Sequence, residues 1–282
     1  MADELRLSLI QMRAETDARD ANVARACAEI DRLCTAEDGP PDLIVLPELF
    51  NTEYFPQHRD WSYVRYAEPV DGPTMTAIRE RAVRHRTSIV APIYELASPG
   101  HLYDSAIAVG PEGEILATYR KAHPAAMESV EKLYFRPGSK FPVFTLPNGW
   151  RVGMIICYDT YFPESARSVA LHGAELLVIP FAGGTAHRWY DLMAVRAFEN
   201  LLFLAACNKV GVEDRQPFGG RSCVFDPFGE MLVTASGDRE ESISTTLDRS
   251  QIWQARTRYS MYRDRRPDLY RALVTDAEDL HG

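Results

Sequence analysis

Strand-like and helix-like patterns alternate along almost the whole chain, and this alternation is what most restricts its possible folds. Residues 5–11 alternate apolar and polar side chains, as a half-buried strand does. Residues 20–36 instead place apolar side chains at helical spacing, and a Gly-Pro-Pro stretch follows. Residues 42–47 are a short apolar run ended by proline, which predicts a buried strand. The same strand–helix order returns from residue 152 onward, so layers of helices on sheets are expected.

The other expected elements continue this order through both halves of the chain. They are a helix opened by Asp71-Gly72-Pro73, strands over 87–94, 103–109, 114–119 and 152–157, a helix over 163–171, a strand over 175–179, a helix over 187–201, and strands over 202–207, 221–225, 230–235 and 242–247. No long Gly/Ser/Pro linker divides them, so one α/β domain with two sheets is predicted over residues 1–255. The charged, aromatic stretch 256–282 is either a solvated tail or an arm that contacts a partner subunit.

Composition limits the function classes. The 282 residues carry a net charge of -9, which disfavours general nucleic-acid binding. Neither a signal-peptide pattern nor an apolar run of about 20 residues is found, so membrane insertion is not expected. The cysteines are scattered, at positions 27, 34, 157, 207 and 223. This pattern favours reduced thiols in the cytoplasm over disulfides or a zinc site, and Cys27 and Cys34 are interpreted as core residues.

Three chemically reactive side chains stand at the ends of predicted strands. Glu48 follows Val45-Leu46-Pro47, Lys121 follows Tyr119-Arg120, and Cys157 follows Ile155-Ile156. Strand ends in α/β folds border crevices, so these side chains can converge. Each of them, taken alone, is more often a structural, capping or solvated residue.

Together the three side chains suit attack on an amide. An ordinary cysteine has a pKa of about 8.5, so it needs a base or a cation to become a nucleophile at neutral pH. Glu48 could accept the thiol proton and return it to the leaving nitrogen. Lys121 and the backbone N–H of Tyr158 could stabilise the tetrahedral oxyanion.

The sequence around these residues resembles the nitrilase superfamily of carbon–nitrogen hydrolases from about residue 5 to 250. The similar motifs are Leu46-Pro47-Glu48-Leu49-Phe50, Tyr119-Arg120-Lys121-Ala122-His123, Cys157-Tyr158-Asp159-Thr160-Tyr161-Phe162-Pro163-Glu164, Arg196-Ala197-Phe198-Glu199-Asn200, and the pattern from Phe218 to Gly229. Five motifs in the same order make coincidence improbable.

This resemblance implies a four-layer α-β-β-α sandwich, usually dimeric, with no metal and no organic cofactor. It implies a Glu48–Lys121–Cys157 triad and an acyl-enzyme intermediate. A second glutamate of the family matches Glu131 here, with Glu128 as the nearest competitor.

The resemblance also bears on the substrate. True nitrilases have Trp-Glu after the cysteine, whereas this chain has Tyr158-Asp159, as in amidases and carbamoylases. Carbamoylases of amino acids carry arginines where Thr160 and Tyr161 stand, so a free α-carboxylate would lack its partner. A linear carboxamide or an N-carbamoyl amine, releasing ammonia, is therefore favoured. An N-carbamoyl amino acid is the alternative.

Several further residues are expected near the substrate. These are Tyr54, Tyr161, Phe181, Ala182 and Arg188, and Arg188 is the nearby cation that could serve an anionic substrate. His123 either contacts the substrate or holds its loop. The glycine-containing stretch 181–186 lacks the ending of a phosphate loop, so it is interpreted as a pocket wall.

Other function classes fit less well. The chain has no G-x-S-x-G elbow of a serine hydrolase, and Cys157 lacks the papain-type surroundings. A non-catalytic binding protein of the same fold remains the rival from a different class, although all three triad residues are present.

Overall fold

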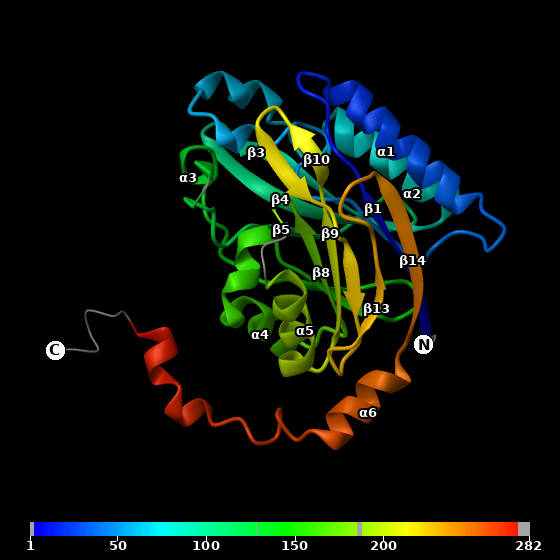
Figure 1. The fold of residues 1–282 in the computed structure, drawn as a ribbon, viewed down its shortest axis with the longest axis vertical. Coiled ribbons are helices and arrows are strands. Elements are labelled where there is room, and N and C mark those ends of the chain that lie inside the picture. Colours follow the sequence, from blue (N-terminus) through cyan, green and yellow to red (C-terminus); the bar gives the residue numbers. More distant parts are fainter. Residues whose placement is uncertain (1–2, 128, 185–187, 276–282) are drawn as a thin grey trace.

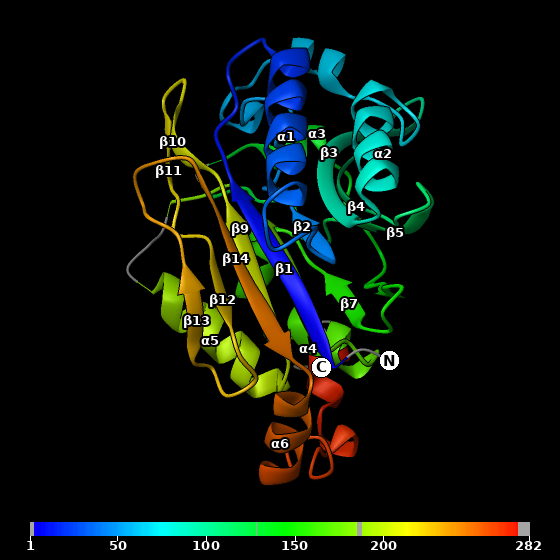
Figure 2. The same ribbon diagram turned by 90° about the vertical axis from the view of Figure 1, so that its right-hand side faces the viewer.

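A computed structural model describes residues 3–127, 129–184 and 188–275. Two six-stranded mixed sheets pack face to face and are covered on their outer faces by helices (Figures 1 and 2). The predicted four-layer α-β-β-α sandwich in a single domain is thus confirmed. In the described part of the chain, no helix has the length and apolar character needed to cross a membrane.

The two sheets have the same arrangement of strands. In spatial order, the first contains β14 (Glu241–Asp248), β1 (Glu4–Gln11), β2 (Leu43–Val45), β3 (Ser88–Ser98), β4 (His101–Val109) and β5 (Ile115–Arg120), and the second contains β13 (Met231–Thr234), β12 (Cys223–Phe225), β9 (Phe203–Asn208), β8 (Leu176–Phe181), β7 (Arg151–Met154) and β6 (Val143–Thr145). Strands β1, β2 and β3 run parallel, as do β7, β8 and β9, and the flanking pairs are antiparallel.

Side chains alternate along each strand between the core that joins the two sheets and the layer under the helices. Leu5, Leu7 and Leu9 of β1 belong to the core between the two sheets, whereas Ile10 packs on the helix side. That outer face is covered by α1 (Arg19–Cys34) and α2 (Pro73–His85), and the second sheet is covered by α4 (Pro163–Leu171) and α5 (Trp189–Asn200). Cys27 and Cys34 lie in the layer between α1 and the first sheet, as predicted.

Most expected elements appear within a few residues of their predicted bounds. The helix after Gly72 begins at Pro73, the hairpin of β4 and β5 is present, and α4 occupies residues 163–171. The helix expected from His187 is described from Trp189, since residues 185–187 lie outside the described ones. The strand predicted over 152–157 is wrong at its end, because β7 stops at Met154 and residue 157 begins a 3-10 turn, η3 (Cys157–Tyr161).

Some elements were not predicted from the sequence. They are η1 (Phe55–Gln57), η2 (Trp61–Tyr66), α3 (Glu131–Tyr134), β6, the separate hairpin of β10 (Val210–Glu213) and β11 (Gln216–Gly219), α6 (Ser250–Arg258), η4 (Pro267–Leu269) and η5 (Arg271–Val274). Most are one or two turns long or three to four residues in length, too short to show a period.

The C-terminal segment leaves the sandwich through α6, which spans the boundary expected at residue 255. Figure 1 shows the segment running as an arc along one end of the molecule. Tyr259 packs against Phe198, and the Tyr262 hydroxyl donates to the Asn200 carbonyl at 2.6 Å. Beyond that point, side chains such as Val274 (88% exposed) do not pack on the sandwich.

Candidate active site

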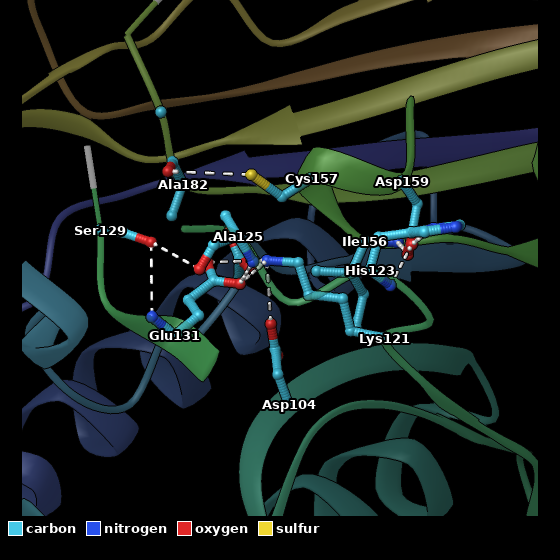
Figure 3. Close-up of polar contacts among 12 residues, drawn as sticks. Asp104, Lys121, His123, Ala125, Ser129, Glu131, Ile156, Cys157, Asp159 and Ala182 are labelled. Atoms are coloured by element: carbon cyan, nitrogen blue, oxygen red, sulfur yellow. Dashed lines mark hydrogen bonds and ion pairs between the residues drawn. The ribbon is translucent and has the colours of Figure 1, made fainter. Parts of the chain in front are cut away.

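The three predicted triad residues meet at one end of the sandwich. Glu48 lies shortly after β2, Lys121 directly after β5, and Cys157 shortly after β7. The first two strands belong to one sheet and β7 to the other. The facing sheets therefore bring together residues that are far apart in the sequence (Figure 3).

Lys121 is the centre of a buried ion cluster. Its ammonium nitrogen lies 2.6 Å from Oε1 of Glu48 and 2.8 Å from the carboxylate of Glu131. The carboxylate of Asp104 lies 3.4 Å from the same nitrogen. All four side chains are completely buried, so the lysine is surrounded by carboxylates and excluded from water.

Glu131 is held from several directions. It opens the short helix α3 and accepts hydrogen bonds from the Tyr54 hydroxyl (2.5 Å) and from the backbone N–H of Ala125 (2.7 Å). Lys121 is its third partner. Its competitor Glu128 lies outside the described residues.

Cys157 lies in a strained turn between β7 and α4. Its φ of 44° is in the left-handed region, which non-glycine residues rarely adopt. Its sulfur faces the Ala182 carbonyl at 4.0 Å, and the residue is 8% exposed. The turn brings Cys157 to the cavity, whereas Cys27, Cys34, Cys207 and Cys223 do not belong to its lining.

Asp159 stabilises this turn from inside. One carboxylate oxygen accepts the backbone N–H of Ile156 (3.0 Å) and the Tyr119 hydroxyl (2.5 Å). The other accepts the backbone N–H of His123 (2.9 Å) and faces its Nδ1 (2.7 Å). The His123 ring also stacks on Phe162 at 3.9 Å. Of its two predicted roles, this geometry favours holding the loop.

Burial and mutual charge shift the protonation equilibria of the cluster. Burial raises the pKa of Glu48, and the opposing effect of Lys121 does not cancel the rise. Burial opposes the charge of Lys121, but Glu131 and Glu48 outweigh it and raise the pKa of the lysine well above its ordinary value. Burial and the nearby Glu48 charge raise the pKa of the Cys157 thiol as well. At neutral pH the cluster therefore holds an ammonium beside a protonated thiol.

A cavity of about 510 Å³ opens onto the thiol. Its lining residues are Tyr54, Ala125, Met127, Ser129, Glu131, Cys157, Tyr158, Tyr161, Phe181, Ala182, Gly183, Gly184 and Gln216. Four predicted substrate-contacting residues, namely Tyr54, Tyr161, Phe181 and Ala182, are among them. Glu131 is the one carboxylate, and no Lys or Arg belongs to the lining within the described ranges.

Arg188 does not join this lining. Its side chain is 78% exposed and pairs with Asp191 at 3.0 Å, one turn further along the chain. The neighbouring residues 185–187, of which 185 and 186 belong to the predicted pocket wall, lie outside the described residues.

Sequence reasoning missed Asp104, Met127, Ser129 and Gln216. For Asp104 a signal was available: it shares the inward face of β4 with Ala106 and Ala108, where a carboxylate is unexpected. Gln216 comes from the unpredicted β10–β11 hairpin, so no local pattern pointed to it.

Comparison with known proteins agrees with this architecture. The profile of the family described as carbon-nitrogen hydrolase matches residues 6–257. The chain is 35% identical over 282 aligned residues to an N-carbamoylputrescine amidase from Solanum lycopersicum, covering 92% of each sequence.

Solved structures show the same fold. A carbon-nitrogen hydrolase from Helicobacter pylori G27 superposes with a TM-score of 0.90 at 27% identity, over 97% of this chain and 99% of that one. An amidase from Nesterenkonia sp. AN1 gives 0.80 at 26% identity, over 95% and 97%. A mutant of that amidase carries the acetamide moiety of fluoroacetamide covalently at its active-site cysteine. The chain described here belongs to the carbon–nitrogen hydrolase family of the nitrilase superfamily.

Proposed function

We propose that this enzyme hydrolyses a linear carboxamide or an N-carbamoyl amine, with release of ammonia, through a thioester on Cys157. One observation carries the proposal: the buried cluster of Glu48, Lys121 and Glu131 stands beside a thiol that opens into a cavity of about 510 Å³. In a relative, the Nesterenkonia amidase, the active-site cysteine bonds covalently to the acetamide moiety of fluoroacetamide, which supports a nucleophilic role for the cysteine.

Acylation begins from the protonated thiol. Because the pKa of Cys157 is raised by burial, no thiolate is stored, and Glu48 takes the proton as the sulfur attacks the carbonyl carbon. The carbonyl oxygen becomes an oxyanion, stabilised by the Lys121 ammonium and the Tyr158 backbone N–H. The proton held by Glu48 then passes to the amide nitrogen, the C–N bond breaks, and ammonia leaves.

Deacylation reverses these roles. Water attacks the thioester carbon while Glu48 accepts one of its protons. The C–S bond then breaks, and the proton returns from Glu48 to the sulfur. The product is a carboxylic acid, or a carbamic acid that decomposes to the amine and carbon dioxide.

Glu131 has a supporting part in this scheme. It anchors the ammonium of Lys121 and reaches the cavity wall beside Tyr54. From there it can accept a hydrogen bond from the NH₂ group of the substrate. A carboxylate in this position favours an amide or carbamoyl group, which has N–H donors to offer, over an ester.

The distal part of the substrate is proposed to be uncharged or cationic. Tyr158, Tyr161, Phe181 and Met127 form an aromatic and thioether wall, which suits aliphatic groups or a cation over a ring face. The relative named for N-carbamoylputrescine supports the N-carbamoyl amine class.

An ammonia-release screen tests this proposal. We expect turnover with one or more members of a panel of carboxamides and N-carbamoyl amines, and none with the Cys157→Ala variant. Cys34→Ala, which removes a similarly buried thiol from α1, is the matched control and should keep full activity. Turnover by Cys157→Ala at the rate of the control would refute the mechanism.

A further inference from the structure

Asp104 lies in the active-site cluster without a part in the scheme above. It stands on the inward face of β4, fully buried, and its backbone carbonyl accepts the N–H of Lys121 at 2.9 Å. Figure 3 shows its carboxyl group approaching Lys121 from the side away from Cys157. It is not among the residues that line the cavity.

Three carboxylate oxygens of Asp104 and Glu48 have no hydrogen-bond donor in the part of the chain that the structure describes. Lys121 is hydrogen-bonded to Oε1 of Glu48 and to Glu131. Within the described residues, Oε2 of Glu48 and both oxygens of Asp104 are buried without an N–H or O–H partner. Three unmatched acceptors in one dry cluster would be expensive if both acids were ionised, because each buried acceptor left unsatisfied costs about 1–3 kcal/mol.

A single proton shared between the two acids joins one oxygen of Asp104 to Oε2 of Glu48, so only one of the three atoms is left without a partner. The charged groups that face Asp104 are Glu48, Lys121 and Glu131, and Tyr94 is its cross-strand neighbour on β3. Three carboxylates thus surround one ammonium. Burial and the charge of Glu48 raise the pKa of Asp104 well above its ordinary value, and the two side chains are within hydrogen-bonding contact.

We propose that Asp104 is a positioning residue that stays protonated in the resting enzyme and donates a hydrogen bond to the carboxylate of Glu48. This inference rests on the proposed role of Glu48 as the base. The bond leaves Glu48 ionised, and therefore able to accept the thiol proton, in a place where burial opposes its charge. It also fixes the orientation of the carboxylate between Lys121 and the thiol.

The competing assignment is an ionised Asp104 that serves as a third counterion of Lys121. The two assignments predict opposite behaviour for an isosteric, neutral replacement. Asn at position 104 keeps the shape, offers an N–H to Glu48 and carries no charge. It therefore replaces a protonated aspartate but not an ionised one.

The experiment compares Asp104→Asn with Asp104→Val across the pH profile of kcat/KM. We expect Asp104→Asn to stay within about threefold of the wild type, with an unchanged acidic limb. Asp104→Val removes the donor and should lose about 10- to 100-fold, the effect of a hydrogen bond to a charged group. Its acidic limb should move to higher pH, because Glu48 without its donor protonates more easily as the pH falls.

Infrared spectroscopy gives a readout that does not depend on activity. In the wild-type minus Asp104→Asn difference spectrum at pH 8, we expect the carbonyl stretch of a protonated carboxylic acid. Circular dichroism melting checks that both variants are folded. Absence of that stretch, or an Asp104→Asn variant as impaired as Asp104→Val, would overturn the proposal. Failure of the proposed function would instead appear as turnover by Cys157→Ala, with the infrared band unaffected.

Discussion

Lys121 and Glu48 form a direct ion pair with no exposed surface: 2.6 Å separates the ammonium nitrogen from the carboxylate oxygen. Glu48 is the proposed base and Lys121 the proposed oxyanion cation, and each holds the other in place. We therefore expect Glu48→Gln and Lys121→Met each to lower kcat/KM by about three orders of magnitude or more. The double variant should be little worse than the poorer single one, since the residues act as a unit. Steady-state kinetics on the three variants measure this.

Folding must be separated from catalysis in this test. Lys121→Met leaves buried carboxylates without their cation, which can cost about 3–5 kcal/mol of stability. Rates should therefore be normalised to the folded fraction from thermal unfolding. Losses that simply multiply in the double variant would show that the two residues work independently.

The hydrogen bonds of Asp159 predict that substitutions around the turn of Cys157 lower activity by different amounts. His123→Ala removes one side-chain contact and the stacking on Phe162, so a loss of about 1 kcal/mol in stability and less than about tenfold in kcat/KM is expected. Asp159→Ala removes four contacts and should lower kcat/KM by about 100-fold or more. Equal effects of the two variants would assign His123 a direct part in the chemistry.

Specificity should follow the cavity lining. Simple carboxamides and N-carbamoyl amines should have higher kcat/KM than N-carbamoyl-α-amino acids of matched size. A free carboxylate would be buried near Glu131 with no cation in the described lining. Because Arg188 points to solvent and pairs with Asp191, Arg188→Ala should leave this ratio unchanged. A preference for the free acids that disappears in Arg188→Ala would reverse this interpretation.

The C-terminal arm should contribute to assembly. Residues 256–262 are anchored on their own subunit through Tyr259 and Tyr262, but Trp253 (76% exposed) and Val274 stay uncovered. We expect these surfaces to pack on a second copy of the chain. Removing residues 264–282 while keeping that anchor should lower the mass measured by light scattering. An unchanged mass would make the arm a solvated tail.

The sequence by itself determined the layers and the site residues that belong to motifs. Alternation in β1 and helical spacing in α1 are local patterns that show which side chains share a face, so they can be read without coordinates. Glu48, Lys121 and Cys157 were identified because each ends an apolar run within a recognisable motif.

Only the tertiary structure decided which other side chains belong to the active site. Asp104 becomes part of the cluster because β4 lies beside β5, the strand that ends at Lys121, and no pattern in one strand encodes that neighbourhood. Arg188 was expected near the substrate, just past the predicted pocket wall, yet its side chain turns to solvent. Contacts of this kind depend on how two sheets face each other, whereas periodicity reports only which face of an element is buried.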